Sequence, residues 1–204
     1  NENIFYNTAI SKIEILGATN QLPITNNVSL YFQGEANTVS IEKPRIVTGD
    51  FALEFWMNNG TTATTATIFS QEEGLSITLA NQQMAATLGG MTASGGITND
   101  GLFHHYTITL NNESGGFYIY EDDKQIAETA ITPNTPFTNS QTLIIGGNTF
   151  VGNIHALRMW NKSLTLSNAY ANIYTKIIGN EKNLIGYWPM NEGRGTVAHD
   201  LAFF

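Results

Sequence analysis

A strict two-residue alternation between Phe51 and Met57 constrains the fold of this chain more than any other feature of its sequence. Large apolar residues stand at every odd position of the segment, whereas Glu54 and Trp56 stand at even positions. Side chains alternate between the two faces of an extended strand, so odd and even positions face opposite sides. The segment therefore predicts a strand over residues 51–57, with an apolar face toward a core.

Segments of the same kind recur along the chain, separated by Gly, Asn and Asp residues, which favour turns. Further strands are expected at residues 28–32, 39–41, 67–70, 75–79, 84–88, 104–110, 116–120, 125–129, 143–147, 154–160 and 184–188. Residues 121–124 predict the hairpin turn between two of them. Many short strands with a turn every ~8–12 residues are typical of a β-sandwich or barrel. A length of 204 residues suits one such domain.

One stretch, residues 163–174, has apolar residues at near-helical spacing instead of strict alternation. Ser167 is a suitable N-cap, because its hydroxyl oxygen can accept a hydrogen bond from a backbone N–H of the first helical turn. The sequence therefore predicts one short helix from Ser167 to Ile177, before the chain returns to a strand at Leu184.

Charge and residue counts exclude several classes of function. The chain has nine basic and 17 acidic residues, with a formal net charge of −8. The basic residues are dispersed, so the chain lacks the electrostatic footprint of a nucleic-acid binder. The sequence has no run of about 18 apolar residues, so we expect no membrane insertion. The chain has no cysteine, which excludes disulfides, a thiol nucleophile and a Cys-based zinc site.

The order of the strand segments between residues 28 and 175 is informative in itself. Its pieces are residues 30–34, 39–41, 51–56, 68–70, 103–106, 116–120, 144–147 and 150–164. In order and spacing they resemble the LamG-like jelly-roll domains of the concanavalin A-like lectin/glucanase superfamily and, more distantly, the pentraxins. The resemblance implies an all-β, two-sheet antiparallel jelly-roll sandwich, to which residues 1–204 are assigned as one domain.

The C-terminal segment from Leu184 to Thr196 resembles the strand that usually opens such a unit, and Asp200 falls where that pattern often has Asp. Two interpretations stay open. The segment 184–204 closes this domain by pairing with its N-terminal region, or it begins the next unit of a tandem array. We favour the first, because Trp188 is otherwise exposed.

Since the superfamily includes glucanases, the resemblance raises catalytic carboxylates as an alternative. Retaining glycosidases use two carboxyl groups about 5 Å apart, and the laminarinase-like relatives place Glu, Asp and Glu along one strand. Glu72 and Glu73 are adjacent instead, and we expect them in a turn before Gly74. His104 and His105 are also adjacent, so they face opposite sides of a strand. We therefore expect no catalytic residue and no enzyme activity.

Calcium is the cofactor that the resemblance raises, because many relatives bind it. The family often has Asp at two positions where this chain has Gln33 and His155. We therefore expect no metal and no cofactor, with calcium as the alternative. Calcium takes six to eight oxygen ligands, and the residues able to supply some are Glu35, Asn37, Glu192 and Asp200.

The candidate ligand-binding residues are Tyr118, Tyr120, Trp56, Glu54 and Arg158. The aromatic ones are expected on outward strand faces, where a flat ring with a polar group can stack against a sugar; packing under loops is the alternative. The family commonly has Glu and Arg at the points occupied by Glu54 and Arg158. We expect these two to pair with each other in preference to gripping a ligand. Trp160 is expected to pack beneath the short helix.

Together these patterns predict a non-catalytic binding or adhesion module of an extracellular or cell-surface protein of bacterial origin. Its expected partners are a glycan or an extracellular protein, together with neighbouring domains of a longer chain. Two alternatives stay open. One is a glycoside hydrolase or lyase domain with divergent catalytic acids, and the other is a structural spacer in a tandem array.

Overall fold

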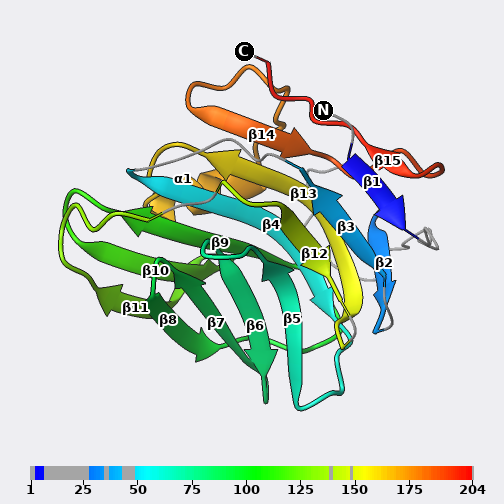
Figure 1. Ribbon diagram of the computed structural model, residues 1–204, viewed down its shortest axis with the longest axis horizontal. Coiled ribbons are helices and arrows are strands. Elements are labelled where there is room, and N and C mark those ends of the chain that lie inside the picture. Colours follow the sequence, from blue (N-terminus) through cyan, green and yellow to red (C-terminus); the bar gives the residue numbers. More distant parts are fainter. Residues whose placement is uncertain are drawn as a thin grey trace.

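The computed structural model describes residues 3–6, 28–34, 37–42, 49–137, 140–147 and 149–203. These residues form two antiparallel sheets packed face to face, with one short helix (Figure 1). In spatial order, the eight-stranded sheet contains β15 (Val197–Ala198), β1 (Asn3–Tyr6), β3 (Thr38–Ile41), β12 (Leu143–Gly146), β5 (Thr65–Ser70), β6 (Ser76–Ala80), β7 (Gln83–Leu88) and β8 (Met91–Gly96).

In the seven-stranded sheet, β4 and β13 are paired neighbours within the sheet. Its strands in spatial order are β11 (Lys124–Ala130), β10 (Gly116–Glu121), β9 (His104–Asn111), β4 (Phe51–Asn59), β13 (Val151–Trp160) and β14 (Leu184–Trp188), while β2 (Leu30–Gln33) pairs with the first part of β13. The predicted two-sheet antiparallel jelly-roll sandwich is confirmed.

The core lies between the two sheets and follows the alternation of β4. Phe51, Leu53, Phe55 and Met57 all belong to the large buried cluster between the sheets. The ring of Phe55 lies 4.8 Å from that of Phe69 on β5 in the opposite sheet. Burial of such a side chain stabilises the fold by ~1.5–3 kcal/mol, so these contacts fix which face of β4 is turned inward.

Strand β8 is an element that the sequence pattern does not predict. Its sequence, MTASGG, has one large apolar residue, so it shows no strong alternation. Pairing creates the strand: Gly89 and Gly90, both at positive φ, turn the chain so that Met91 faces Leu88 of β7. Gly95 is required because a side chain there would collide with the Ile126 carbonyl of β11. The strand is specified by its neighbours and not by its own residues.

The helix α1 spans Leu166–Ile173 and begins earlier than the predicted boundary at Ser167. Its N-cap is Thr165, whose Oγ1 accepts a hydrogen bond from the backbone N–H of Asn168 over 3.2 Å. Thr165 has extended backbone angles, as an N-cap requires, while Ser167 already lies in the first turn. The helix ends at Ile173, four residues before the predicted end. Its buried residues Ala169 and Ile173 face the seven-stranded sheet.

The C-terminal segment joins both sheets. β14 pairs with β13, and the pairing of the C-terminal segment with the N-terminal region is made by β15, which lies beside β1. Trp188 is buried against the core, with 4% of its surface exposed. The assignment of residues 1–204 to one domain stays a prediction.

Among the described residues, no helix has the length and apolar character needed to cross a membrane.

Candidate functional site

The outer face of the seven-stranded sheet, turned away from the core, has two halves. α1 lies against the half formed by β4 and β13, as the contacts of Asn172 with Glu54 and Arg158 show (Figure 1). Among the described residues, no helix lies over the half formed by β9 and β10. The covered half holds a group of polar residues, which we call the covered cluster: Glu54, His105, Arg158 and Trp160, which are buried, and Asn172, which is partly buried.

Glu54 is the centre of the covered cluster and is completely buried. One carboxylate oxygen accepts a hydrogen bond from the indole N–H of Trp160 over 2.7 Å. Both oxygens accept from the side-chain amide of Asn172, over 3.0 and 3.1 Å. Burial raises the pKa of Glu54, although Arg158, Asn172 and Trp160 act to lower it. The donors therefore stabilise a charge that water cannot reach.

Arg158 is the counter-charge, and its pairing with Glu54 agrees with the expectation from sequence. Its Nη1 lies 3.8 Å from a Glu54 carboxylate oxygen and donates to the backbone carbonyl of Asn172 over 3.0 Å. Arg158 and Glu54 face each other across the β4–β13 pairing. α1 thus supplies hydrogen bonds to both members of the ion pair through one residue.

Two buried histidines lie in this part of the sheet, His105 within the covered cluster and His155 beside it. His105 Nε2 lies 3.7 Å from Glu54, and burial lowers the pKa of His105 well below its ordinary value. His155 stacks on Trp56, with ring centroids 5.9 Å apart and an angle of 4° between the rings. Burial lowers the pKa of His155 to about 3, so it is neutral at physiological pH. At the position where the family often has Asp, this chain places an uncharged ring among aromatic neighbours.

Three of the five candidate ligand-binding residues lie on the covered half of the sheet. Glu54, Trp56 and Arg158 are each at most 2% exposed, so their side chains are not presented at the surface of the structure. Trp160 packs beneath the residues around α1, as expected. Tyr118 and Tyr120 lie on the uncovered half of the face.

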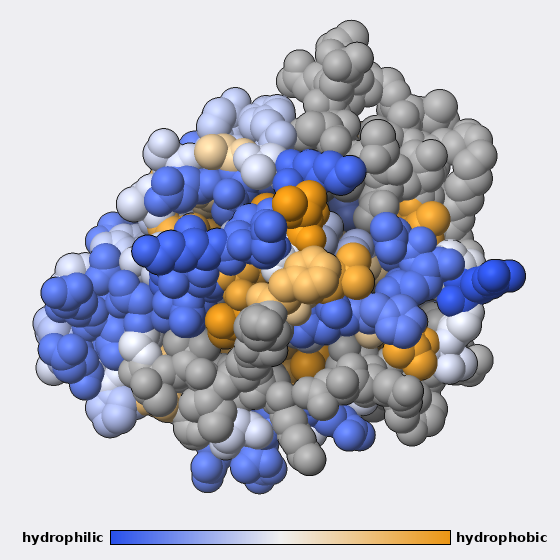
Figure 2. Space-filling view, turned by 90° about the horizontal axis from the view of Figure 1, so that it is seen from above, coloured by the Kyte–Doolittle hydropathy of each residue, from blue (hydrophilic) through white to orange (hydrophobic). Residues whose placement is uncertain are grey.

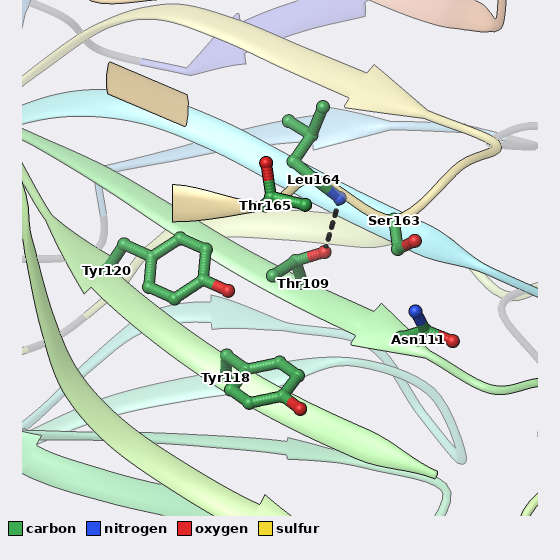
Figure 3. Close-up of a pocket in the computed structure, with 7 residues that line it drawn as sticks. All are labelled: Thr109, Asn111, Tyr118, Tyr120, Ser163, Leu164 and Thr165. Carbon is green, nitrogen blue, oxygen red and sulfur yellow. Dashed lines mark hydrogen bonds between the residues drawn. The ribbon is translucent and has the colours of Figure 1, made fainter. Parts of the chain in front are cut away.

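The two tyrosines line a small cavity of about 160 Å³, which we call the tyrosine pocket. Its lining residues are Thr109, Asn111, Tyr118, Tyr120, Ser163, Leu164 and Thr165. Three segments build it, namely β9, β10 and the connection from β13 to α1. Figure 3 shows the tyrosine rings side by side, with their hydroxyl groups on the side of Thr109 and Asn111.

The tyrosine rings are positioned by the backbone beneath them. Gly116, Tyr118 and Tyr120 alternate outward along β10, and a side chain at position 116 would collide with the Tyr118 ring. The rings of Tyr118 and Tyr120 are stacked, with centroids 6.0 Å apart and 26° between the planes. Tyr120 is 5% exposed, and burial, together with Tyr118 and Glu128, raises its pKa to about 12. Tyr118 is half-buried and forms the accessible wall.

Hydrogen bonds fix the wall opposite the tyrosines. The backbone N–H of Leu164 donates to Thr109 Oγ1 over 2.9 Å, and Ser163 Oγ donates to Asp50 over 3.1 Å. Asn111 accepts from the backbone N–H of Ser114 through its carbonyl oxygen. The polar groups at the pocket are the amide group of Asn111, the two tyrosine hydroxyls and the hydroxyl groups of Thr109, Ser163 and Thr165. Sequence reasoning did not single out Asn111, Ser163 or Thr165, because nothing in their local pattern indicates that β9 and the α1 connection meet.

The residues considered as calcium ligands serve the backbone instead. Asp200 accepts hydrogen bonds from the backbone N–H groups of Tyr187 and Ala202, at 2.9 and 3.0 Å. Glu192 accepts from the backbone N–H of His199. Glu35 lies outside the described residues. No group of three or more His, Asp or Glu residues in the described part of the chain is arranged to hold a metal ion.

Exposed apolar side chains gather on another side of the molecule, at the connection between α1 and β14 and at the C-terminal segment. Ile178, Leu201 and Phe203 are 57%, 44% and 71% exposed. The backbone N–H of Phe203 donates to the Gly179 carbonyl over 2.7 Å, which holds the two segments together. Figure 2 shows hydrophobic residues on this face bordered by hydrophilic ones. None of the three residues lines the tyrosine pocket.

A family model described as the concanavalin A-like lectin/glucanases superfamily matches residues 28–168. Curated proteins give no sequence match. Among solved structures, the botulinum neurotoxin serotype D/C VPI 5993 binding domain gives a TM-score of 0.67 at 15% identity, covering 88% of this chain and 48% of that one. The binding domain of Paraclostridial Mosquitocidal Protein 1 gives 0.67 at 12% identity, over 85% and 47%.

A third solved structure is the botulinum neurotoxin serotype D ligand binding domain in complex with N-acetylneuraminic acid. Its TM-score is 0.62 at 14% identity, and the match covers 88% of this chain and 51% of that one. The present chain thus spans about half the length of these solved structures. At such identities the likeness shows the jelly-roll fold alone.

Proposed function

Since the chain belongs to the concanavalin A-like lectin/glucanase superfamily, we propose that it is a non-catalytic binding module that holds a carbohydrate in the tyrosine pocket. One observation carries the proposal. Tyr118 and Tyr120 form a stacked aromatic pair on the half of the sheet face that α1 leaves uncovered, with the Asn111 amide beside them.

The chemistry of the pocket suits a sugar ring. A pyranose has an apolar face that packs on an aromatic ring and hydroxyl groups that need hydrogen-bond partners. Tyr118 offers the ring, while Asn111 and the tyrosine hydroxyls offer donors and acceptors. The volume of about 160 Å³ is below the ~300–1,000 Å³ of drug-sized sites. We therefore expect the pocket to hold one ring of a larger glycan.

The same lining argues against hydrolysis. A glycosidase needs two carboxyl groups about 5 Å apart, or roughly 6.5–9.5 Å apart in inverting enzymes, on either side of the bond that breaks. No Asp or Glu lines the tyrosine pocket. The buried carboxylate of Glu54 lies beneath α1 and is bound by Asn172 and Trp160. The hydrolase or lyase alternative is therefore less favoured than a binding module.

We extend the proposal to the setting of the protein: an extracellular or cell-surface location in a bacterium, without calcium. Similar structures are binding domains of bacterial toxins, and one was solved with N-acetylneuraminic acid. Another is described as dependent on two ganglioside molecules for cell entry. Those properties belong to chains about twice as long as this one, so they support the proposal only as analogy. The acidic net charge of −8 gives no support to a nucleic-acid partner.

A glycan array, run with and without calcium, tests the proposal. We expect binding of at least one glycan class in both conditions, and its loss in Tyr118→Ala and Tyr120→Ala. Tyr174→Ala is the matched control, because Tyr174 is 52% exposed on the C-cap of α1 and does not line the pocket. Equal binding by Tyr118→Ala and the wild type contradicts the site. Binding to no glycan favours the structural spacer, and release of reducing sugar favours the enzyme.

A further inference from the structure

A second cavity lies at the other end of β4 from the tyrosine pocket. Its volume is about 340 Å³, and we call it the amide pocket, lined by Asn59, Thr61, Thr62, Ala63, Thr64, Leu79, Asn81, Gln82 and Asn99. β4 begins at Phe51, whose carbonyl accepts from Thr109 of the tyrosine pocket, and ends at Asn59. The strand between them is roughly 26 Å long at ~3.3 Å per residue, so one monosaccharide cannot touch both cavities.

One wall of the amide pocket is held against the start of β13. The backbone N–H of Gly60 donates to the Val151 carbonyl over 2.9 Å. Thr61 Oγ1 donates to the same carbonyl over 3.1 Å and accepts from the Val151 N–H over 3.2 Å. Asn59 accepts from the backbone N–H of Thr61 over 3.0 Å. The loop that follows β4 is therefore fixed at its base before any ligand arrives.

Another part of the lining is the two-residue turn between β6 and β7. Asn81 and Gln82 both have positive φ, 50° and 63°, and connect the paired residues Ala80 and Gln83. Such turns favour Asn followed by Gly, because the second position is strained for a residue with a side chain. Gln82 stands there instead, and its carbonyl accepts from the Ile97 N–H over 2.9 Å. The turn thus carries a glutamine side chain at a position where glycine would be more stable.

The lining has one consistent chemistry. Seven of the nine side chains carry an amide or a hydroxyl group, two are apolar, and none is charged or aromatic. Within the described part of the chain, the side chains of Asn81, Gln82 and Asn99 make no hydrogen bond with the protein, so their groups are available to a ligand. Each amide places two donors beside an acceptor, which matches the neighbouring hydroxyl groups of a sugar.

From this geometry we infer that the amide pocket is a second binding site, which takes an uncharged saccharide through hydrogen bonds. A carboxylated sugar is disfavoured, because no cationic side chain is present to neutralise it. A flat aromatic ligand is disfavoured too, because the pocket has no ring to stack on it. The site therefore differs in selectivity from the tyrosine pocket, and its existence does not depend on that pocket binding anything.

The test is a titration of the isotope-labelled chain with lactose, maltotriose and 3′-sialyllactose at millimolar concentrations, followed by amide chemical shifts. We expect a neutral probe to shift the amides of residues 59–64, 81–82 and 99. Gln82→Gly should weaken that binding roughly fivefold, the factor that one net hydrogen bond corresponds to. The same substitution should raise the thermal midpoint of unfolding, because glycine relieves the positive φ. Asn99→Ala should weaken binding without that rise.

The outcomes separate the two sites. Tyr118→Ala should leave the shifts at residues 59–64, 81–82 and 99 unchanged. Shifts confined to residues 109–120 support the tyrosine pocket and overturn the amide pocket, whereas the reverse pattern supports the amide pocket alone. No shift at the amide-pocket residues with any neutral probe overturns the inference, as does unaltered binding in both Gln82→Gly and Asn99→Ala.

Discussion

Glu54 on β4 and Tyr118 on β10 both project from the outer face of the same sheet, yet their surroundings are opposite. Glu54 is completely buried beneath α1 and accepts hydrogen bonds from Asn172 and Trp160. Tyr118 has no helix over it and forms the accessible wall of a pocket. The two strands are separated by β9 alone. A third layer over one half of the sheet accounts for the difference.

The role of a polar group on an outward strand face depends on whether a helix covers it. Beneath α1 water is excluded, so every charge needs a protein partner and the residues become fixed parts of the structure. On the uncovered half, the same kind of position leaves a ring and its hydroxyl group available to a ligand.

Removing the buried carboxylate is the most damaging change. Glu54→Ala leaves Arg158 buried without its counter-charge and deprives Asn172 and Trp160 of their acceptor. We expect the free energy of unfolding to fall by ~3–5 kcal/mol, measured by chemical denaturation.

The control is Glu128→Ala on β11 of the same sheet, where the carboxylate is exposed and bonded only to Gln125 over 2.9 Å. Its effect should stay within ~0.5 kcal/mol. The double variant Glu54→Met, Arg158→Leu should recover part of the loss, because it removes both charges together. Equal effects of Glu54→Ala and Glu128→Ala would remove the contrast between the covered and uncovered halves.

Acid should act on the covered half through His155. Burial, with a smaller effect of Arg158, lowers the pKa of His155 from 6.5 to about 3. In the unfolded chain, the imidazole of His155 takes up a proton as the pH falls below about 6.5. In the folded chain, the same imidazole stays neutral until the pH reaches about 3. Stability present above pH 6.5 is therefore lost as the pH falls, by up to ~1.4 kcal/mol per pH unit. Denaturation midpoints between pH 7 and 5 measure the slope.

Two other ionisable groups of the covered half also change the pH dependence of stability, so the control must leave them in place. His105, whose pKa burial also lowers, adds a loss in the same direction, whereas the raised pKa of Glu54 acts in the opposite sense. His155→Leu should leave the contributions of His105 and Glu54 in place. It should reduce the slope of stability against pH by the contribution of one histidine. An unchanged slope in this variant contradicts the buried, neutral state of His155.

How far the sequence predicts this contrast is clear from β4. Alternation correctly separates Phe55 from Glu54 and Trp56, because it depends on local geometry alone. The burial of Glu54 depends on Asn172, which is 118 residues further along the chain. A local pattern has no access to such a contact, so Trp56 was a candidate ligand residue although it is buried. The outward position of Tyr118 was predicted for the same local reason that succeeds in β4.

The remaining differences also come from contacts between distant segments. Strand β8 has too few apolar residues to be predicted, and its pairing with β7 creates it. The start of α1 was misplaced because Thr165 and Ser167 can both cap a helix, and in the structure it is Thr165 whose side chain accepts from the Asn168 N–H. Asn111 and Ser163 meet at the tyrosine pocket although they are 52 positions apart in the sequence, 163 minus 111.

Thr165 lies at the boundary between the two halves, since it caps α1 and also lines the tyrosine pocket. Thr165→Ala removes the acceptor for the Asn168 N–H and should cost ~1 kcal/mol of unfolding free energy, measured by denaturation. Thr165→Ser keeps the hydroxyl group and should cost less. If α1 is held mainly by Asn172 and its apolar face, both variants will have the same stability, and the cap will have no role in covering Glu54.

The smallest effect on stability is expected on the uncovered half of the sheet face. Tyr118→Ala removes a half-buried ring that stacks on Tyr120, so we expect a loss below ~1 kcal/mol. Tyr118→Phe should cost still less, because it keeps the ring, and it tests whether the hydroxyl group matters for glycan binding. Denaturation and the glycan array must be read together. A large loss of stability in Tyr118→Ala would mean that Tyr118, like Glu54, is a structural residue. The proposal that the uncovered half is the binding site would then be contradicted.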